Sequence, residues 1–182
     1  MIQFDIETLK LIGSYVWLGY LIALTILFVL MLKTRRVGSS FITVLVVAVA
    51  VWFMDSYRDF MLLIMNNKEL VSEYKTLIRY AWYFGFAAFS IAIIAVIWRV
   101  HVAFVIPYSY LTRVVIALRS VVVLIQLYRL LERQSFNSEI MTEIGYQWSI
   151  IIINIVGVGV ALLFAFIALG AHLKKVKIRG VV

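Results

Sequence analysis

Five charged residues stand inside stretches that are otherwise apolar: Asp55, Arg58, Asp59, Arg113 and Arg119. A charge at membrane depth costs free energy, so it indicates a functional site or a partner of opposite charge. At about 1.5 Å of helix per residue, Asp55 and Arg119 reach similar depths in their own stretches. We therefore expect a buried Arg119–Asp55 pair, with Arg58 and Asp59 nearer the outer surface. Arg113 is expected either at mid-depth or close enough to the inner face to reach it.

A polar stripe follows the same segment as Arg119. A spacing of seven residues is nearly two helical turns, so its members project within a narrow arc. Thr112, Arg119, Gln126 and Arg133 follow this spacing, and Ser109 and Arg129 add to the same side. Two interpretations stay open. The stripe either lines a water-filled path or binds an anionic group, or it packs against the second apolar stretch with Asp55 neutralising Arg119.

The sequence offers few residues for catalysis, metal binding or cofactor binding. The absence of cysteine excludes disulfides, thiolate zinc sites and cysteine nucleophiles. The two histidines, His101 and His172, fall near the inner boundaries of different segments, and no other feature supports haem between them. The sequence also lacks the motifs of zinc proteases, serine hydrolases and P-loop nucleotide-binding proteins. We expect no enzymatic activity, no cofactor and no bound metal.

The composition indicates the environment of these residues. Of 182 residues, 65% are hydrophobic and 14% are charged, whereas a soluble domain is about 45–50% apolar and about 25% charged. Too few polar residues are present to cover a water-soluble globule. The composition predicts an all-α integral membrane protein with no soluble domain.

Five apolar stretches are long enough to cross a hydrocarbon layer of about 30 Å, which takes about 20 residues. They cover approximately 11–32, 41–65, 80–98, 108–131 and 147–171. Segments 66–79 and 132–146 are then outer connections. The first stretch is preceded by carboxylates rather than by a basic region, so it is expected to be a retained span and not a cleaved signal. We expect residues 1–182 to form one polytopic domain, a bundle of about five transmembrane helices.

The basic residues predict the orientation. Segments 33–38, 99–107 and 172–182 together hold eight Lys and Arg residues and no carboxylate. Lys and Arg in short loops favour the cytoplasmic side. The chain is therefore expected to have its N-terminus outside and its C-terminus inside, most simply in a bacterial inner (cytoplasmic) membrane. The basic inner face suits anionic lipid, and nucleic acid is not needed to explain it.

Small residues mark expected helix contacts, because they let helix backbones approach within a bilayer. They recur at helical spacing on the third and fifth segments, as Gly85, Ala88, Ala92, Gly157, Ala161 and Ala165. These stripes either pack within one bundle or form a seam with another copy or another membrane subunit.

The general features suggest two functions of different kinds. A small polytopic chain with a lysine-rich inner tail and no soluble domain resembles phage lysis holins, and equally accessory subunits of membrane complexes. The first expectation is a non-catalytic, oligomeric protein that lines a polar path as a pore, a channel or a holin-like assembly. The alternative is an accessory or assembly subunit that docks through its small-residue stripes.

Overall fold

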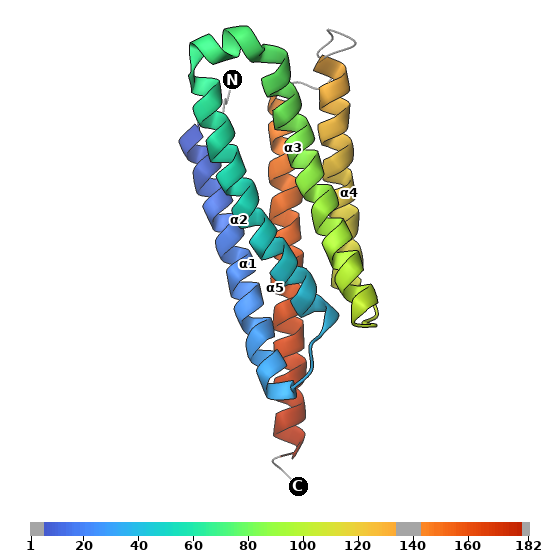
Figure 1. Ribbon diagram of the computed structural model, residues 1–182. Helices are drawn as coiled ribbons and strands as arrows, with labels where there is room; N and C mark the ends of the chain where they lie inside the picture. Colours follow the sequence, from blue (N-terminus) through green and yellow to red (C-terminus); the bar gives the residue numbers. More distant parts are fainter. Residues whose placement is uncertain (1–5, 134–142, 180–182) are drawn as a thin grey trace.

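The computed structural model describes residues 6–133 and 143–179, with the side chains of 11–133 and 145–174. These parts of the chain contain five helices and no strand (Figure 1). The helices are α1 (Ile6–Thr34), α2 (Ser39–Asn66), α3 (Lys68–Ala103), α4 (Tyr110–Leu131) and α5 (Glu143–Arg179). Each contains a stretch long and apolar enough to cross a membrane. The expectation of an all-α chain with five candidate membrane-spanning helices is confirmed.

The connection between α2 and α3 differs from the expected one. Residues 68–79 continue the helical chain, although they stand in the segment assigned to an outer connection. Asn67 starts α3, since its side-chain oxygen accepts the backbone N–H groups of Glu69 at 3.1 Å and Leu70 at 3.3 Å. The helix is interrupted once, at Tyr74, where φ is −114° and ψ is 27°. Hydropathy detects apolar length only, so it does not distinguish a polar helix from a polar loop.

The connection between α3 and α4 settles where the fourth helix begins. α3 continues to Ala103 and α4 begins at Tyr110, close to the expected start of the fourth span at residue 108. Phe104 caps α3, Val105 has a positive φ of 52°, and Pro107 stands in the connection. The Ser109 hydroxyl then accepts the backbone N–H of Thr112 at 3.2 Å and caps α4.

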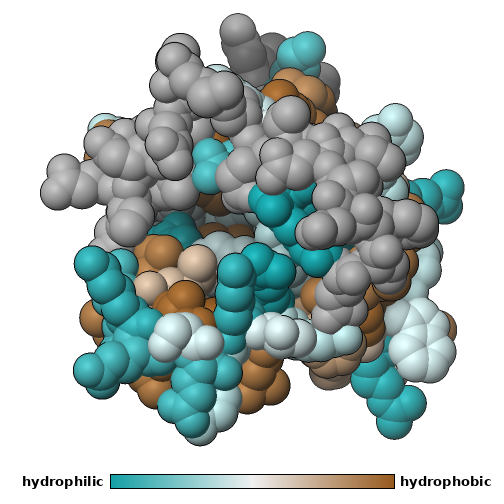
Figure 2. All heavy atoms as spheres, turned by 90° about the horizontal axis from the view of Figure 1, so that it is seen from above, coloured by the Kyte–Doolittle hydropathy of each residue, from teal (hydrophilic) through white to brown (hydrophobic). Residues whose placement is uncertain are grey.

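The helices form a closed ring in chain order. Each helix packs against the next, and α5 packs against α1. The connections α1–α2 and α3–α4 lie at the same end as the C-terminus of α5, which we call the C-terminal end (Figure 1). The turn between α2 and α3 lies at the opposite end, which we call the α2–α3 end. Seen from there, hydrophilic side chains gather over this end of the ring (Figure 2).

The main hydrophobic core draws on all five helices and includes Ala161 and Ala165, both fully buried. Gly157 lies one turn earlier, where an added Cβ would stand 2.7 Å from the Tyr20 hydroxyl oxygen. The fifth helix thus turns its small residues toward its neighbours, and the close approach is to α1.

The small residues of α3 are placed differently. Gly85 lies under the Tyr57 side chain of α2, but Ala88 is only half-buried and Ala92 is exposed. The neighbours of α3 cover another face of the helix. The residues buried there are Tyr83, Ala87, Ser90, Ile93, Ile97 and His101.

Candidate functional site

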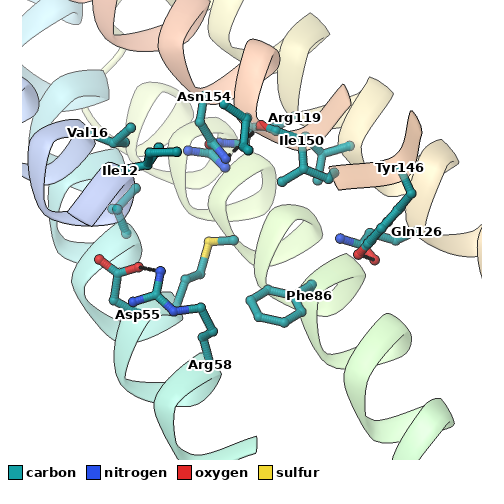
Figure 3. Close-up of a pocket in the computed structure, with 15 residues that line it drawn as sticks. Ile12, Val16, Asp55, Arg58, Phe86, Arg119, Gln126, Tyr146, Ile150 and Asn154 are labelled. Carbon is teal, nitrogen blue, oxygen red and sulfur yellow. Dashed lines mark hydrogen bonds and ion pairs between the residues drawn. The ribbon is translucent and has the colours of Figure 1, made fainter. Parts of the chain in front are cut away.

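A cavity of about 160 Å³ lies inside the ring, in the half nearer the α2–α3 end, and side chains of all five helices line it. Most of the lining is apolar. Its polar side chains come from three helices and are Asp55, Arg58, Arg119, Gln126, Tyr146 and Asn154 (Figure 3). A mostly apolar cavity between the helices of a bundle, with a few polar groups in its lining, is a common kind of ligand site.

Arg119 is the deepest charge of this cavity, with only 4% of its surface exposed. Among the described residues, no carboxylate lies within ion-pair distance of it. Asp55 pairs instead with Arg58, one turn later on α2, with 2.9 Å between Oδ1 and Nη1. The expected Arg119–Asp55 pair is therefore not formed, because a partner on the same helix already holds the carboxylate. Arg58 also approaches Asp59, at 3.4 Å.

Neutral groups surround Arg119. The side chain of Tyr20 on α1 is its hydrogen-bonding neighbour. Asn154 of α5 lines the same side of the cavity, and its amide nitrogen donates to the Ile150 carbonyl at 3.0 Å (Figure 3). Tyr20 hydrogen-bonds the guanidinium, and neither Tyr20 nor Asn154 supplies a negative charge. Arg119 is a buried cation held in place by neutral neighbours.

Gln126 adds donors to the same cavity. Its amide oxygen accepts the Tyr146 hydroxyl at 2.8 Å, which fixes the orientation of the amide. The amide nitrogen, with two N–H donors, then points toward the interior of the cavity (Figure 3). Two guanidinium groups and one carboxylate line the cavity, so its charged lining carries one net positive charge. The arrangement is able to bind an anion.

The polar stripe of α4 faces the inside of the ring. Thr112, Arg119, Gln126 and Arg129 are buried, and Arg133 is half-buried. Arg113, by contrast, is exposed in the first turns of α4 and does not join the charge cluster. The structure therefore brings together the stripe but not the whole set of charges.

Arg129 has a buried carboxylate partner that the sequence reasoning missed. Its Nη1 lies 2.7 Å from Oε2 of Glu132, and both side chains are almost completely buried. The two residues are three positions apart, a spacing that favours ion pairs along a helix. This spacing is the feature of the sequence from which the pair could have been predicted. Arg129 is thus neutralised by the residue that caps its own helix, whereas no carboxylate in the described part of the chain neutralises Arg119.

A cluster of hydroxyl groups and one imidazole lies between α2, α3 and α4, toward the C-terminal end of the ring. The Ser39 hydroxyl lies 2.8 Å from Nε2 of His101 and 2.7 Å from the Thr112 hydroxyl, which lies 2.8 Å from that of Thr43. The backbone N–H of Ser109 donates to Ser39 at 2.9 Å. These residues belong to α2, α3 and α4 or its cap, and α2 and α4 contact each other across the ring. We call them the hydroxyl cluster: Ser39, Thr43, His101, Ser109 and Thr112.

His101 is fully engaged within this cluster. Its Nδ1 donates to the Ile97 carbonyl at 2.7 Å, and its Nε2 meets Ser39. Both ring nitrogens therefore already have hydrogen-bond partners. In the part of the chain that the structure describes, no three His, Asp or Glu side chains are close enough to hold a metal ion. The cluster is a packed polar contact between helix ends.

Comparisons of this chain with protein-family models, with curated proteins and with solved structures found no match. The geometry of the cavity and of the hydroxyl cluster is thus the basis for inferring a function.

Proposed function

We propose that this chain is a multi-pass membrane protein that carries a small anion along the axis of its own five-helix ring. The observation that carries the proposal is Arg119, a buried cation in a cavity lined by all five helices, with no described carboxylate to neutralise it. A buried charge without a counter-ion is costly. A bound anion offsets that cost and gives the charge a role.

The two halves of the ring suit different parts of such a path. The cavity forms the entrance chamber in the half nearer the α2–α3 end. The hydroxyl cluster seals the other half, where α2 meets α4. In this proposal an anion enters from the α2–α3 end and waits at Arg119. It passes on only when α2 and α4 separate at Ser39, Thr43 and Thr112.

A path within one chain is favoured over a holin-like hole built from many copies. A large oligomeric hole needs polar faces on the outside of each subunit. Here the buried face of α4 is the polar one, with Thr112, Arg119 and Gln126 turned inward. The outer faces of the ring expose large apolar side chains instead. The proposal therefore requires no oligomer.

The orientation proposed from the sequence gives this path a direction. Arg35, Arg36 and Arg99 lie at the C-terminal end, while the side chains of Lys175, Lys177 and Arg179 lie outside the described residues. With that end in the cytoplasm of a bacterium, the chamber opens to the outside. Because the chain has no cysteine, a single cysteine at Val182 tests this cleanly. If an impermeant reagent labels this cysteine in intact cells, the C-terminus lies outside and the proposed orientation is wrong.

Anion flux through reconstituted protein tests the function itself. Vesicles that contain the protein should release chloride, nitrate or benzoate faster than empty vesicles. Arg119→Gln should remove most of that acceleration. Arg113→Gln is the matched control, because it removes the same charge from an exposed position of the same helix. Folded protein that accelerates none of these anions, or equal loss in both variants, would refute the proposal.

A second candidate, a subunit of a larger membrane complex, is favoured by two apolar grooves beside α2. One of about 290 Å³ lies between α2 and α3, and one of about 400 Å³ lies between α1 and α2; both include Val49 and Phe53. If a partner helix fills them, Val49→Trp should abolish co-purification of that partner from the native membrane. Ile155→Trp, on an exposed face of α5, should not. Unchanged co-purification, or none at all, would count against a subunit role.

A further inference from the structure

We propose that the anion held at Arg119 is a monocarboxylate with a compact apolar body, rather than a bare inorganic anion. This inference rests on the proposed function, because it names the class of substrate for the same cavity. Its support comes from the charge of the lining, from the apolar residues that make up most of that lining, and from the volume of the cavity.

The charge of the lining selects a single negative charge. Arg58 is already paired with Asp55 at 2.9 Å, which leaves Arg119 as the cation of the lining that no carboxylate of the described residues neutralises. One bound carboxylate makes the lining neutral. A divalent anion such as hydrogen phosphate would leave an unpaired negative charge beside Asp55, and like charges at close range are unfavourable in a low-dielectric site.

The donors around Arg119 suit a planar carboxylate. A guanidinium presents parallel N–H groups that match the two oxygens of a carboxylate. The amide nitrogen of Gln126, nearly two turns further along α4, adds a second donor to the same cavity (Figure 3). A spherical ion such as chloride uses only part of this donor geometry.

The rest of the lining is apolar and selects a hydrocarbon body. Phe86 of α3 lies across the cavity from Arg119 (Figure 3). Other apolar residues of the lining include Val51, Met54 and Ile150, and together with Phe86 we call them the apolar wall. An inorganic anion would leave this wall either dry and empty or covered by poorly hydrogen-bonded water. A hydrocarbon group removes the wall from water, which favours binding in proportion to the apolar surface that it covers.

The volume limits that body to a compact group. The cavity measures about 160 Å³. An apolar cavity of roughly 150 Å³ in another protein accepts benzene. A phenyl ring or a short branched chain therefore fits beside Arg119, whereas the extended chain of a membrane fatty acid does not.

Thermal unfolding of the full chain in detergent tests the inference. Benzoate is the probe, and chloride, phosphate, palmitate and the neutral isostere benzamide are compared with it at constant ionic strength. We expect benzoate to raise the melting temperature more than chloride or phosphate, and benzamide to have no effect. Ligands that bind only the folded state raise its stability with concentration. Stabilisation by palmitate in place of benzoate would overturn the compact body.

Three variants assign the effect to the cavity. Arg119→Lys keeps the charge but loses the paired donors, and should weaken benzoate binding about tenfold. Arg113→Lys should leave it unchanged. Val122→Phe fills the cavity one turn after Arg119 and should abolish the benzoate effect. If Val122→Phe does not fold, the two lysine variants decide the outcome between them.

The unfolding experiment distinguishes the failure of this inference from the failure of the proposed function. Stabilisation by chloride or phosphate that depends on Arg119, with none by benzoate, overturns the monocarboxylate and keeps an anion site. The absence of any Arg119-dependent effect with all of the anions overturns both. Benzoate stabilisation that persists unchanged in Arg119→Lys also overturns the inference, because it would then reflect partition into detergent.

Discussion

Gly157→Ala is the substitution whose effect the structure defines most sharply. A Cβ at position 157 of α5 would lie 2.7 Å from the Tyr20 hydroxyl oxygen of α1, closer than van der Waals contact. Tyr20 is 2% exposed and is a hydrogen-bonding neighbour of Arg119. The hydroxyl cannot retreat without disturbing that interaction. We expect the α1–α5 contact to be overpacked and the protein to be destabilised.

A matched control on the same helix gives the packing cost of Gly157→Ala. At Gly159 an added Cβ meets no atom within 4 Å, so Gly159→Ala changes only helix propensity, by about 0.5–1 kcal/mol in favour of alanine in water. Gly157→Ala gains the same propensity and adds overpacking, which typically costs about 1–3 kcal/mol. The difference between the two variants isolates the packing cost. We expect Gly157→Ala to be less stable than Gly159→Ala by about 1–3 kcal/mol.

Reversible unfolding in mixed micelles, followed by circular dichroism as the denaturing detergent is increased, measures this difference. The same two alanine variants are then compared in a Tyr20→Phe background, which completes a double-mutant cycle. Tyr20→Phe removes the oxygen that the new methyl group would meet. There the gap between the two alanine variants should shrink to within about 0.5 kcal/mol. Equal stability of Gly157→Ala and Gly159→Ala in the wild-type background would refute the close approach of α1 and α5.

Two further predictions concern the ion pairs and the hydroxyl cluster. In double-mutant cycles with Asp55→Asn, Arg58→Gln should couple to it by about 0.2–1 kcal/mol, as part-exposed pairs do; stronger coupling to Arg119→Gln would contradict the pairing. Thr112→Val keeps the side-chain shape but removes the hydroxyl that meets three others, and should cost about 1–3 kcal/mol of unfolding free energy. Thr25→Val is the control, because it removes an exposed hydroxyl that bonds to its own helix, and it should change the unfolding free energy by no more than about 0.5 kcal/mol. Equal losses in the two variants would show that the hydroxyl cluster does not stabilise the fold.

The helices were predictable because apolar length alone specifies them. Five stretches of sufficient length correspond to five helices, and the main errors concern helix ends, as in 68–79, where polar residues are helical. The inward face of α4 was also predictable. A spacing of seven holds Thr112, Arg119 and Gln126 within one arc. The six-residue step from Arg113 to Arg119 turns the helix so that their side chains stand about 120° apart, which agrees with the exposure of Arg113.

The partners of the charges were not predictable from depth. Depth gives one coordinate of a side chain, while an ion pair also requires that two helices present those faces to each other. Asp55 and Arg119 share a cavity, yet Arg58 takes the carboxylate because it stands one turn away on the same helix. The hydroxyl cluster was missed for the same reason. Serine and threonine at helix ends are ordinary caps until the ring brings α2, α3 and α4 together.

The energetics of Arg119 distinguish the cavity from the rest of the polar interior. Two other buried polar side chains have partners within the bundle: Arg129 has Glu132 at 2.7 Å, and His101 has a partner at each ring nitrogen. Replacing a buried charge by a packed apolar side chain often stabilises a protein. A leucine at position 119 would therefore serve stability better than an arginine without a counter-ion. A departure from local stability rules is expected where a residue serves binding, which is why we assign the anion to Arg119 and not to the neutralised Arg129.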